Sequence, residues 1–528
     1  MAKSNKKNTK KNNKNLLKII IPALVVVIIA VTLVVVLTMP DPNENDSKEI
    51  EYTEPAKITA DVDKDKVHQA EPATNADGEI DQNGSGELMS YIPMNIKSIK
   101  VENEKSKFEI TSYTPVEITT DKDGKKKEST RATEYTLVGY EDKTLASGQP
   151  DAIANDAASL EFTKVVSTGD KDEKDFGFDK PRSTVEITYQ DNTKAKIYVG
   201  AVAPSNAGIY VKFGTGKTIY LVEEESIDSF LFGINDLIDL NITDPAKSGD
   251  DATATKIELS GKRYKDKITV VPSDDETAMT NYLITTPKAY YGDDSGCSEV
   301  EGGIRGIMAK SVVYVNPGDS QLEKYGLKEP YAEINATYPD TTVNLIASKG
   351  DDKGYCFIMK KGGDVIYKIL TDSVRWTKSS LEDLRSDFFV DNELTALSKT
   401  EVKFGDKSYT FDIDGKTSSA DTVVKYKGKQ ISTGYFQTAF DYMHGSDFLR
   451  HEFTNESLSG SPELTIKFTY KADTGRGADE LKFYDMGNQK YYVTVNGEQI
   501  SYIYKSAVTK VEKLFTSVTK SSPKDDQN

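Results

Sequence analysis

Few residues in this chain have the type and spacing needed to bind a metal ion. There are three histidines: His68 lies in a polar N-terminal stretch, and His444 and His451 enclose Asp447. Zinc sites usually combine ligands one helical turn apart with a third strong ligand. His451 follows His444 by seven positions, so the two would share a face only if a helix continued past them. We interpret them as polar surface residues and predict no metal site.

Two acidic stretches resemble the beginning of a calcium-binding loop. Residues 121–124 read Asp-Lys-Asp-Gly, and residues 412–415 read Asp-Ile-Asp-Gly. Calcium loops of the EF-hand type continue to a closing glutamate, which neither stretch reaches. We therefore predict turns at both places, and the sequence leaves calcium binding open.

The motifs of phosphate binding and catalysis are also missing. Residues 214–217, Gly-Thr-Gly-Lys, have the composition of a phosphate loop but lie between two predicted strands, which favours a hairpin turn. The sequence contains no Cys-x-x-Cys pair, no Walker loop and no nucleophile elbow. Carboxylate pairs for glycoside hydrolysis are uninformative, because 84 acidic residues always supply some pair. We predict no catalytic or cofactor-binding residues, no cofactor, and a protein that is not an enzyme.

Cysteine usage does not point to a disulfide framework. Cys297 and Cys356 are the two cysteines of the chain, too few for disulfide bonds to stabilise a fold of this size. A single bridge between them and two buried thiols both fit, because the sequence does not give their separation.

An internal repeat organises the elements around these residues. Residues 176–181 read Phe-Gly-Phe-Asp-Lys-Pro and residues 325–330 read Tyr-Gly-Leu-Lys-Glu-Pro, an offset of 149. A strand-like run follows each and ends at Tyr189 or Tyr338, and the pattern returns in part at 462–470. Glycine accepts a positive φ and proline is tolerated where a strand begins. We predict a turn that leads into a strand, with the aromatic side chain buried beside the turn.

The repeats predict three tandem modules of class α+β. Alternating apolar and polar residues fill most of each module and indicate half-buried strands. We expect mainly antiparallel sheets with one or two helices packed on one face. The modules cover residues 95–245, 254–395 and 398–518, before a polar tail at 519–528. Helical spacing occurs at residues 151–160, 226–231, 300–308, 379–389 and 433–443.

The N-terminus has the pattern of a membrane anchor. Residues 1–18 carry seven lysines and no acid, and residues 19–39 carry no charge. About 20 apolar residues span a bilayer core, and this run is too long for a signal peptide and lacks a cleavage site. We predict a basic cytoplasmic tail, an uncleaved transmembrane helix at 19–39, and a disordered acidic linker at 40–94. The rest of the chain would then lie outside the plasma membrane.

Charge limits the classes of partner. The formal net charge is −17, and without the seven N-terminal lysines it is −24. Such an acidic region argues against nucleic acid as a partner. The 29 tyrosines fit half-buried strands, and a tyrosine-rich sheet face is also a plausible contact for protein or glycan.

The central block resembles the bacterial domain-of-unknown-function 4340 family. The resemblance rests on Tyr-Gly-Leu-x-x-Pro at 325–330, Thr-Val-x-Ile-Thr-Tyr at 184–189, and the Tyr-Val strands that follow the latter. It implies a membrane-anchored extracytoplasmic protein, often associated with ABC transporters of the gliding-motility type. We therefore expect a non-enzymatic binding or accessory protein that works with ABC transporter subunits. The alternative is a cell-surface protein that binds wall polymer or glycan through tyrosine-rich sheet faces.

Overall fold

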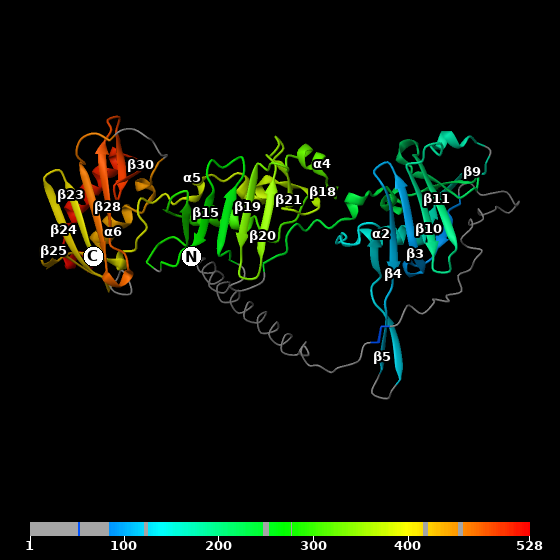
Figure 1. Ribbon diagram of the computed structural model, residues 1–528, viewed down its shortest axis with the longest axis horizontal. Helices are drawn as coiled ribbons and strands as arrows, with labels where there is room; N and C mark the ends of the chain where they lie inside the picture. Colours follow the sequence, from blue (N-terminus) through cyan, green and yellow to red (C-terminus); the bar gives the residue numbers. More distant parts are fainter. Residues whose placement is uncertain are drawn as a thin grey trace, which may run out of the picture.

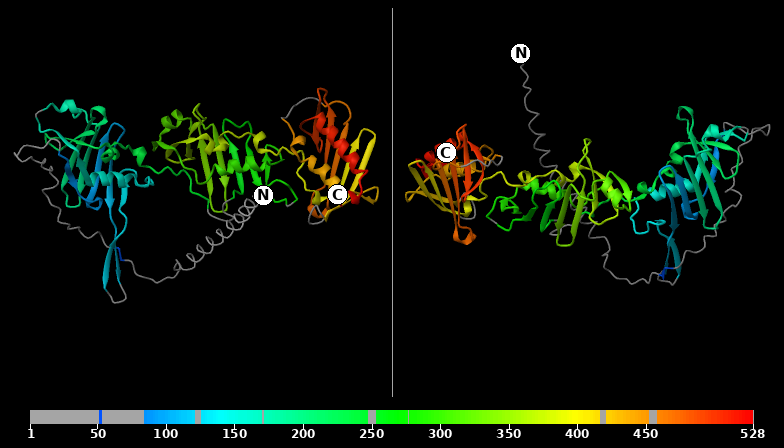
Figure 2. Two further views of the ribbon diagram at one scale, coloured as in Figure 1. Left: turned by 180° about the vertical axis from the view of Figure 1, so that it is seen from behind. Right: turned by 45° about the horizontal axis from the view of Figure 1, so that its top comes forward.

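Three large antiparallel sheets form the body of the molecule. The computed structural model describes residues 51–52, 84–120, 125–169, 171–246, 253–275, 277–415, 421–451 and 458–527. Within these residues the sheets follow one another in a row, seen in all views (Figures 1 and 2). We call the parts built on them the first, second and third domains. Each of the predicted ranges 95–245, 254–395 and 398–518 contains one large sheet.

The three sheets share the order of their central strands and differ at their edges. In each, a hairpin is joined antiparallel to a meander of four strands, through the pairs β3–β10, β14–β19 and β23–β27. The first sheet has the order β7-β4-β3-β10-β11-β12-β13-β9 and the second β17-β16-β15-β14-β19-β20-β21-β22-β18. The third has the order β26-β25-β24-β23-β27-β28-β29-β30. The common order is that of a duplicated unit, which the sequence repeat predicts.

The strand bounds are as follows. The first sheet contains β3 (Ile96–Asn103), β4 (Lys107–Tyr113), β7 (Glu134–Leu137), β9 (Lys164–Ser167), β10 (Ser183–Tyr189), β11 (Lys194–Val202), β12 (Ile209–Phe213) and β13 (Ile219–Val222). The second contains β14 (Lys256–Ser260), β15 (Ile268–Pro272), β16 (Tyr282–Thr286), β17 (Tyr290–Tyr291), β18 (Ser311–Val315), β19 (Ala332–Thr337), β20 (Thr342–Ala347), β21 (Tyr355–Lys360) and β22 (Val365–Leu370). The third contains β23 (Leu397–Phe404), β24 (Lys407–Asp414), β25 (Val423–Tyr426), β26 (Lys429–Gln430), β27 (Leu464–Tyr470), β28 (Ala478–Asp485), β29 (Lys490–Val495) and β30 (Glu498–Tyr504). Smaller sheets pair β1 (Glu51–Tyr52) with β5 (Val116–Thr120), β5 with β6 (Lys126–Thr130), and β2 (Gly86–Ser90) with β8 (Ser159–Phe162).

The repeated glycine turn is confirmed. Gly177, Gly326 and Gly460 precede β10, β19 and β27, and have φ values of 80°, 69° and 80°. A side chain at Gly177 would also meet the backbone of Ala201, so glycine is required there for space as well as for conformation. The aromatic residue before the turn is buried at Phe176, whose ring packs edge-on at 4.9 Å against Tyr210, but only half-buried at Tyr325.

The predicted class α+β is wrong, because the molecule is mainly β with few helices. The described residues contain six α-helices: α2 (Gln149–Ala158), α3 (Asp294–Gly302), α4 (Asp319–Lys324), α5 (Leu381–Leu384), α6 (Thr433–Tyr442) and α7 (Lys505–Val518). Helices were predicted correctly at 151–160 and 433–443, whereas 226–231 forms two 3₁₀ turns and 379–389 only the single turn of α5. The helix predicted at 300–308 ends at Gly302. Segments this short do not sustain an α-helix by themselves, and here they serve as connections.

The N-terminal predictions fall mostly on residues that the structure does not describe. The predicted transmembrane helix at 19–39 lies outside the described residues, and among those described no helix is both long and apolar enough to cross a membrane. The linker predicted at 40–94 is too long at its C-terminal end, because residues 86–90 form β2. Leu88 and Met89 of this strand are buried in the first domain, a two-residue apolar signal that is easily missed in sequence.

One buried carboxyl group of the first domain gives a pH-dependent prediction. Asp156 lies on α2 and accepts a hydrogen bond from the Ser229 hydroxyl at 2.5 Å. Burial raises the pKa of Asp156 from 3.8 to about 6, although its hydrogen bonds with Ser229 lower it in part. The folded protein therefore holds this proton more tightly than the unfolded chain, so Asp156 stabilises the fold below its ordinary pKa and loses that contribution as the pH rises through about 6.

Replacing Asp156 with asparagine removes this dependence. As the pH rises from about 4 to about 7, we expect the unfolding free energy of Asp156→Asn to increase relative to that of the wild type by about 1–2 kcal/mol. Urea unfolding at both pH values measures the difference. Parallel pH profiles for the two proteins would contradict it.

Candidate functional site

The two junctions between domains differ in character. One contiguous cluster of buried apolar residues runs from Leu88 to Leu384 and so joins the first and second domains. The third domain has its own cluster, from Phe389 to Val518, which includes α6 and α7. Its contact with the second domain is made largely by polar and charged side chains. The second junction is therefore the place where a cleft lies between separately packed bodies.

A cavity of about 790 Å³ opens at this second junction, and we call it the junction cleft. This volume lies in the range of small-molecule sites, roughly 300–1,000 Å³. Lys288, Arg385, Arg450 and Arg476 supply its positive charges, and Asp275, Asp479 and Glu498 its negative charges. Its apolar lining consists of Leu283, Ile284, Phe388, Phe389, Val390 and Val495.

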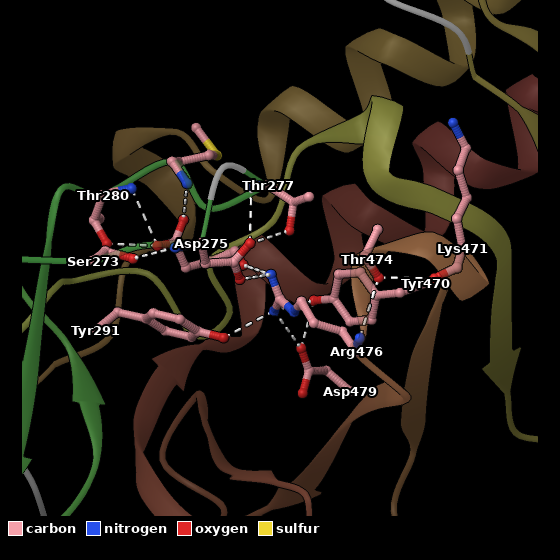
Figure 3. A network of polar contacts seen from close by, with 12 residues as sticks. Ser273, Asp275, Thr277, Thr280, Tyr291, Tyr470, Lys471, Thr474, Arg476 and Asp479 are labelled. Atoms are coloured by element: carbon pink, nitrogen blue, oxygen red, sulfur yellow. Dashed lines mark hydrogen bonds and ion pairs between the residues drawn. The ribbon is translucent and has the colours of Figure 1, made fainter.

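Arg476 connects the two domains on one side of the cleft. Its guanidinium lies between Asp275 and Tyr291 of the second domain and Tyr470 and Asp479 of the third (Figure 3). Nη2 donates to the Tyr291 hydroxyl at 2.8 Å and to Asp479 Oδ2 at 3.1 Å. Nη1 lies 3.4 Å from Asp275 Oδ2. Because one side chain serves acceptors from both domains, it fixes their relative position.

The ionisation of this network is shifted away from neutral pH. Burial would lower the pKa of Arg476, but Tyr470, Tyr291 and Asp479 more than offset it and the pKa is raised. Burial raises the pKa of Tyr291 to about 12, and burial with the nearby Asp479 carboxylate raises that of Tyr470. A general acid or base needs a pKa near the working pH. These groups are therefore suited to holding charge and hydrogen bonds, and not to transferring protons.

Asp391 lies in the segment between the two domains and binds residues of both. It is fully buried, and its carboxylate accepts hydrogen bonds from the Thr280 N–H at 3.1 Å and the Thr280 hydroxyl at 2.5 Å. Its carbonyl oxygen accepts from Arg476 Nη1 at 2.8 Å. The connecting segment is thereby attached to both domains.

Arg385 and Arg450 form a second cationic centre in the cleft. Both side chains are only 4% exposed, and both are paired with Glu382. Arg450 also donates from Nε to the Ser386 carbonyl at 2.7 Å and from Nη2 to the Arg385 carbonyl at 3.0 Å. Burial, together with the charge of Arg450, lowers the pKa of Arg385. Asp387 Oδ1 also lies 3.6 Å from Arg450 Nη2, so two carboxylates, Glu382 and Asp387, compensate the two buried guanidiniums.

The Arg385 guanidinium is held by Glu382 and by the ring of Tyr290. Its Nε donates to Glu382 Oε2 at 3.0 Å. Its Nη2 is buried and forms an ion pair with the same oxygen at 2.8 Å. The ring of Tyr290 lies 5.5 Å from the guanidinium and stabilises its charge without accepting these donors.

The histidines considered from sequence do not come together. Helix α6 ends at Tyr442, so His444 and His451 are not on one helix. The His444 ring packs at 4.6 Å on Phe440, and His451 stacks at 4.9 Å on Tyr502. Burial lowers the pKa of both. No cluster of metal-ligating side chains occurs among the described residues, and His68 lies outside them.

The predicted loops have mixed outcomes. Residues 214–217 lie between β12 and β13, which pair antiparallel, so the hairpin turn is confirmed. The turn predicted at 412–415 is wrong for residues 412–414, which belong to β24. The stretch 121–124 lies outside the described residues.

The cysteines and tyrosines are structural. Cys297 and Cys356 are both free and buried, and burial raises the pKa of each thiol to about 12. Tyr189, Tyr220, Tyr338 and Tyr367, in and beside the strands, are buried. These four side chains therefore do not contribute to an exposed tyrosine surface on the sheets.

Sequence reasoning missed the arginines of the junction cleft. Arg385, Arg450 and Arg476 lie far apart in the chain and belong to no motif. The available signal was composition, because arginine is rare beside the many lysines of this chain and is favoured at buried ion pairs.

Comparison with known proteins gives one match. The family model for Domain of unknown function (DUF4340) matches residues 136–288 and 282–450, two tandem copies that together span more than half of the 528 residues. No curated protein and no solved structure matches the chain.

Proposed function

Given that the chain belongs to the DUF4340 family of domains of unknown function, we propose that it is a non-enzymatic binding protein whose ligand or partner occupies the junction cleft. The observation that carries this proposal is the cleft itself: a cavity between two separately packed domains, with apolar residues and buried arginines in its walls. Sites at domain interfaces with apolar walls and a few convergent polar groups are typical of ligand binding.

Binding is favoured over catalysis by the state of the charged groups. The pKa values of the tyrosine hydroxyls in the network are raised by burial, and the pKa of Arg476 is raised by the tyrosines and Asp479 beside it. Such groups orient and hold a bound molecule. The cleft therefore has the chemistry of recognition.

The proposed location is the outer face of the plasma membrane, beside an ABC-type transporter complex. Its support is the uncharged run at 19–39, the lysines before it, and the resemblance of the repeats to proteins found with such transporters. An anchor raises the local concentration of the binding domains near a membrane partner. Binding of wall polymer or glycan remains the alternative outcome of the same experiment.

Deletion of residues 19–39 tests the location and the partnership. We expect the full-length chain with a C-terminal tag to sediment with membranes and, after crosslinking in intact cells, to capture transporter subunits. The deletion should release the chain from the membrane fraction and abolish the capture, because the anchor is gone. A deletion of equal length within residues 53–83 is the control and should change neither.

Two outcomes would count against this proposal. One is membrane location and partner capture that survive loss of residues 19–39. The other is capture of wall fragments alone, which would favour the surface-binding alternative.

A further inference from the structure

The hairpin formed by β5 and β6 is an addition to the repeat unit of the first domain. It is inserted between β4 and β7, which pair with each other in the first sheet. The corresponding connections of the second and third domains, residues 273–281 and 415–422, are shorter. The β5–β6 hairpin projects from the side of the first domain, out of the row of sheets (Figures 1 and 2).

The apolar core of the first domain does not hold this hairpin. None of its described residues belongs to a cluster of buried apolar side chains. Val116 and Ile118 on β5 are only half-buried, and Lys126 and Lys127 on β6 are exposed. A hairpin of two strands is marginally stable in water by itself, and a third strand is the usual remedy.

The third strand comes from the N-terminal segment of the chain. Strand β1 pairs antiparallel with β5, with Glu51 opposite Ile118 and Tyr52 opposite Glu117. This is strand addition, in which main-chain hydrogen bonds bind an extended segment to the edge of a sheet. The opposite edge of the hairpin is β6, where lysine side chains oppose pairing with further strands. The hairpin therefore accepts an extended segment at its β5 edge.

The direction of β1 shows at which end of the hairpin the N-terminal segment arrives. Strand β5 runs from the domain towards the tip of the hairpin, because it follows β4 in the chain. Strand β1 is antiparallel to β5, so it runs from the tip towards the domain. The chain that precedes Glu51 consequently approaches from the tip.

The length of that chain limits how far the tip can be from a membrane anchor. If the predicted anchor ends at residue 39, residues 40–50 remain before β1, and they span at most about 40 Å when fully extended. Without the pairing, residues 40–85 would separate the anchor from β2, and these could extend to about 160 Å. Pairing of β1 with β5 thus shortens the reach of the tether about fourfold.

We propose that the β5–β6 hairpin is the docking site of the N-terminal segment, which adds β1 as a third strand and so holds the first domain close to the bilayer, with the hairpin tip towards the membrane. This inference rests on the proposed membrane location and adds an orientation to it. The junction cleft lies beyond the second sheet in the row, remote from the anchored hairpin (Figure 1).

Cysteine crosslinking of the full-length chain in lipid nanodiscs tests the pairing. Tyr52→Cys with Glu117→Cys places two thiols on neighbouring strands, within the separation that a disulfide spans. Tyr52→Cys with Ser129→Cys is the matched control, because Ser129 lies opposite Glu117 on the next strand. Under mild oxidation we expect the first pair to crosslink within the chain at least about tenfold faster than the second. The native Cys297 and Cys356 are buried and free in both proteins.

Energy transfer to labelled lipid headgroups tests the orientation. A donor dye is placed on Thr119→Cys in the hairpin or on Tyr435→Cys, at a side chain that is 48% exposed on α6 of the third domain. We expect at least about twofold higher transfer from position 119 than from position 435, because the tether is short.

A double proline variant separates the pairing from the presence of the tether. Successive N–H groups of a strand point to opposite sides, so Glu51→Pro with Tyr52→Pro removes the donor on the β5 side in either case. This variant should lower the transfer from position 119 at least about twofold, since the whole of residues 40–85 then acts as tether. Thr74→Pro with Asn75→Pro, in the same segment, is the control and should leave the transfer unchanged.

Three results would overturn the proposal: equal crosslinking of the two cysteine pairs, transfer that the change at residues 51 and 52 does not alter, and a disulfide that joins two chains. The last would show that β1 pairs with the hairpin of a second copy. Failure of the proposed location is distinguishable, because a chain that does not sediment with membranes still reports the pairing through its disulfide. A chain that sediments with membranes but does not form the disulfide keeps the location and refutes the docking.

Discussion

Replacing Arg476 with alanine is expected to separate the unfolding of the third domain from that of the other two. The guanidinium is 14% exposed and holds acceptors from both sides of the junction, including Asp275 and Asp479. Removing one partner from such a network leaves the others uncompensated, a loss of about 3 kcal/mol. The apolar clusters on the two sides are separate, so the coupling that remains is polar and comes mainly from Arg450, which binds Glu382 and the Ser386 and Arg385 carbonyls.

Urea unfolding of the full-length chain measures this change. Trp376 is the only tryptophan and is buried in the second domain, so its fluorescence follows that domain, while circular dichroism follows all three sheets. The wild type should give similar midpoints with both probes, and Arg476→Ala should add an earlier transition in circular dichroism. Lys107→Ala, which removes an exposed pair with Glu102, is the control and should cost below about 0.5 kcal/mol. Coincident transitions in Arg476→Ala would contradict the role given to this residue.

Replacing Trp376 with alanine is expected to cost about 3–5 kcal/mol in the unfolding free energy of the second domain. The side chain is completely buried in the cluster shared by the first and second domains. Its Nε1 donates to the Gly303 carbonyl at 2.9 Å, which ties the 3₁₀ turn at 375–377 to the end of α3. Alanine would leave a cavity and also an unpaired carbonyl oxygen.

Circular dichroism in urea measures this loss, because the variant has no tryptophan. Trp376→Phe fills much of the cavity but lacks the donor, and should cost less, about 1–3 kcal/mol. Tyr314→Ala, at a side chain that is 36% exposed on β18, should be nearly neutral. A loss below about 1.5 kcal/mol in Trp376→Ala would show that the pocket collapses or that the packing is not as described.

The repeat unit could be predicted from the sequence because its signals are local. Gly177 and Gly326 stand before strands with clear alternation, and only glycine suits the positive φ that the turn requires. The helix content was overestimated because short apolar spacings, as at 379–389, do not distinguish a helix from a connection that crosses the end of a sheet. Tertiary packing decided those segments.

The junction cleft could not be predicted, because its parts meet only through tertiary structure. Arg385 and Arg476 lie 91 positions apart and are brought together by the way the third domain docks on the second. No periodicity or spacing encodes that docking. Histidines and acidic runs attracted attention in the sequence because they have familiar motifs, whereas the buried arginines have none.

Site-specific photo-crosslinking in intact cells tests most directly whether the junction cleft is the binding site. A photoreactive phenylalanine analogue replaces Phe388, which lines the cleft, or Tyr113, which is 43% exposed on β4 of the first domain. If the cleft binds, irradiation should give a discrete adduct at position 388 and none at 113, and Ala289→Trp, which places a large ring at an exposed position of the cleft, should remove it. Absence of an adduct at 388, or the same adduct at both positions, would contradict the proposal that this chain binds through its second junction.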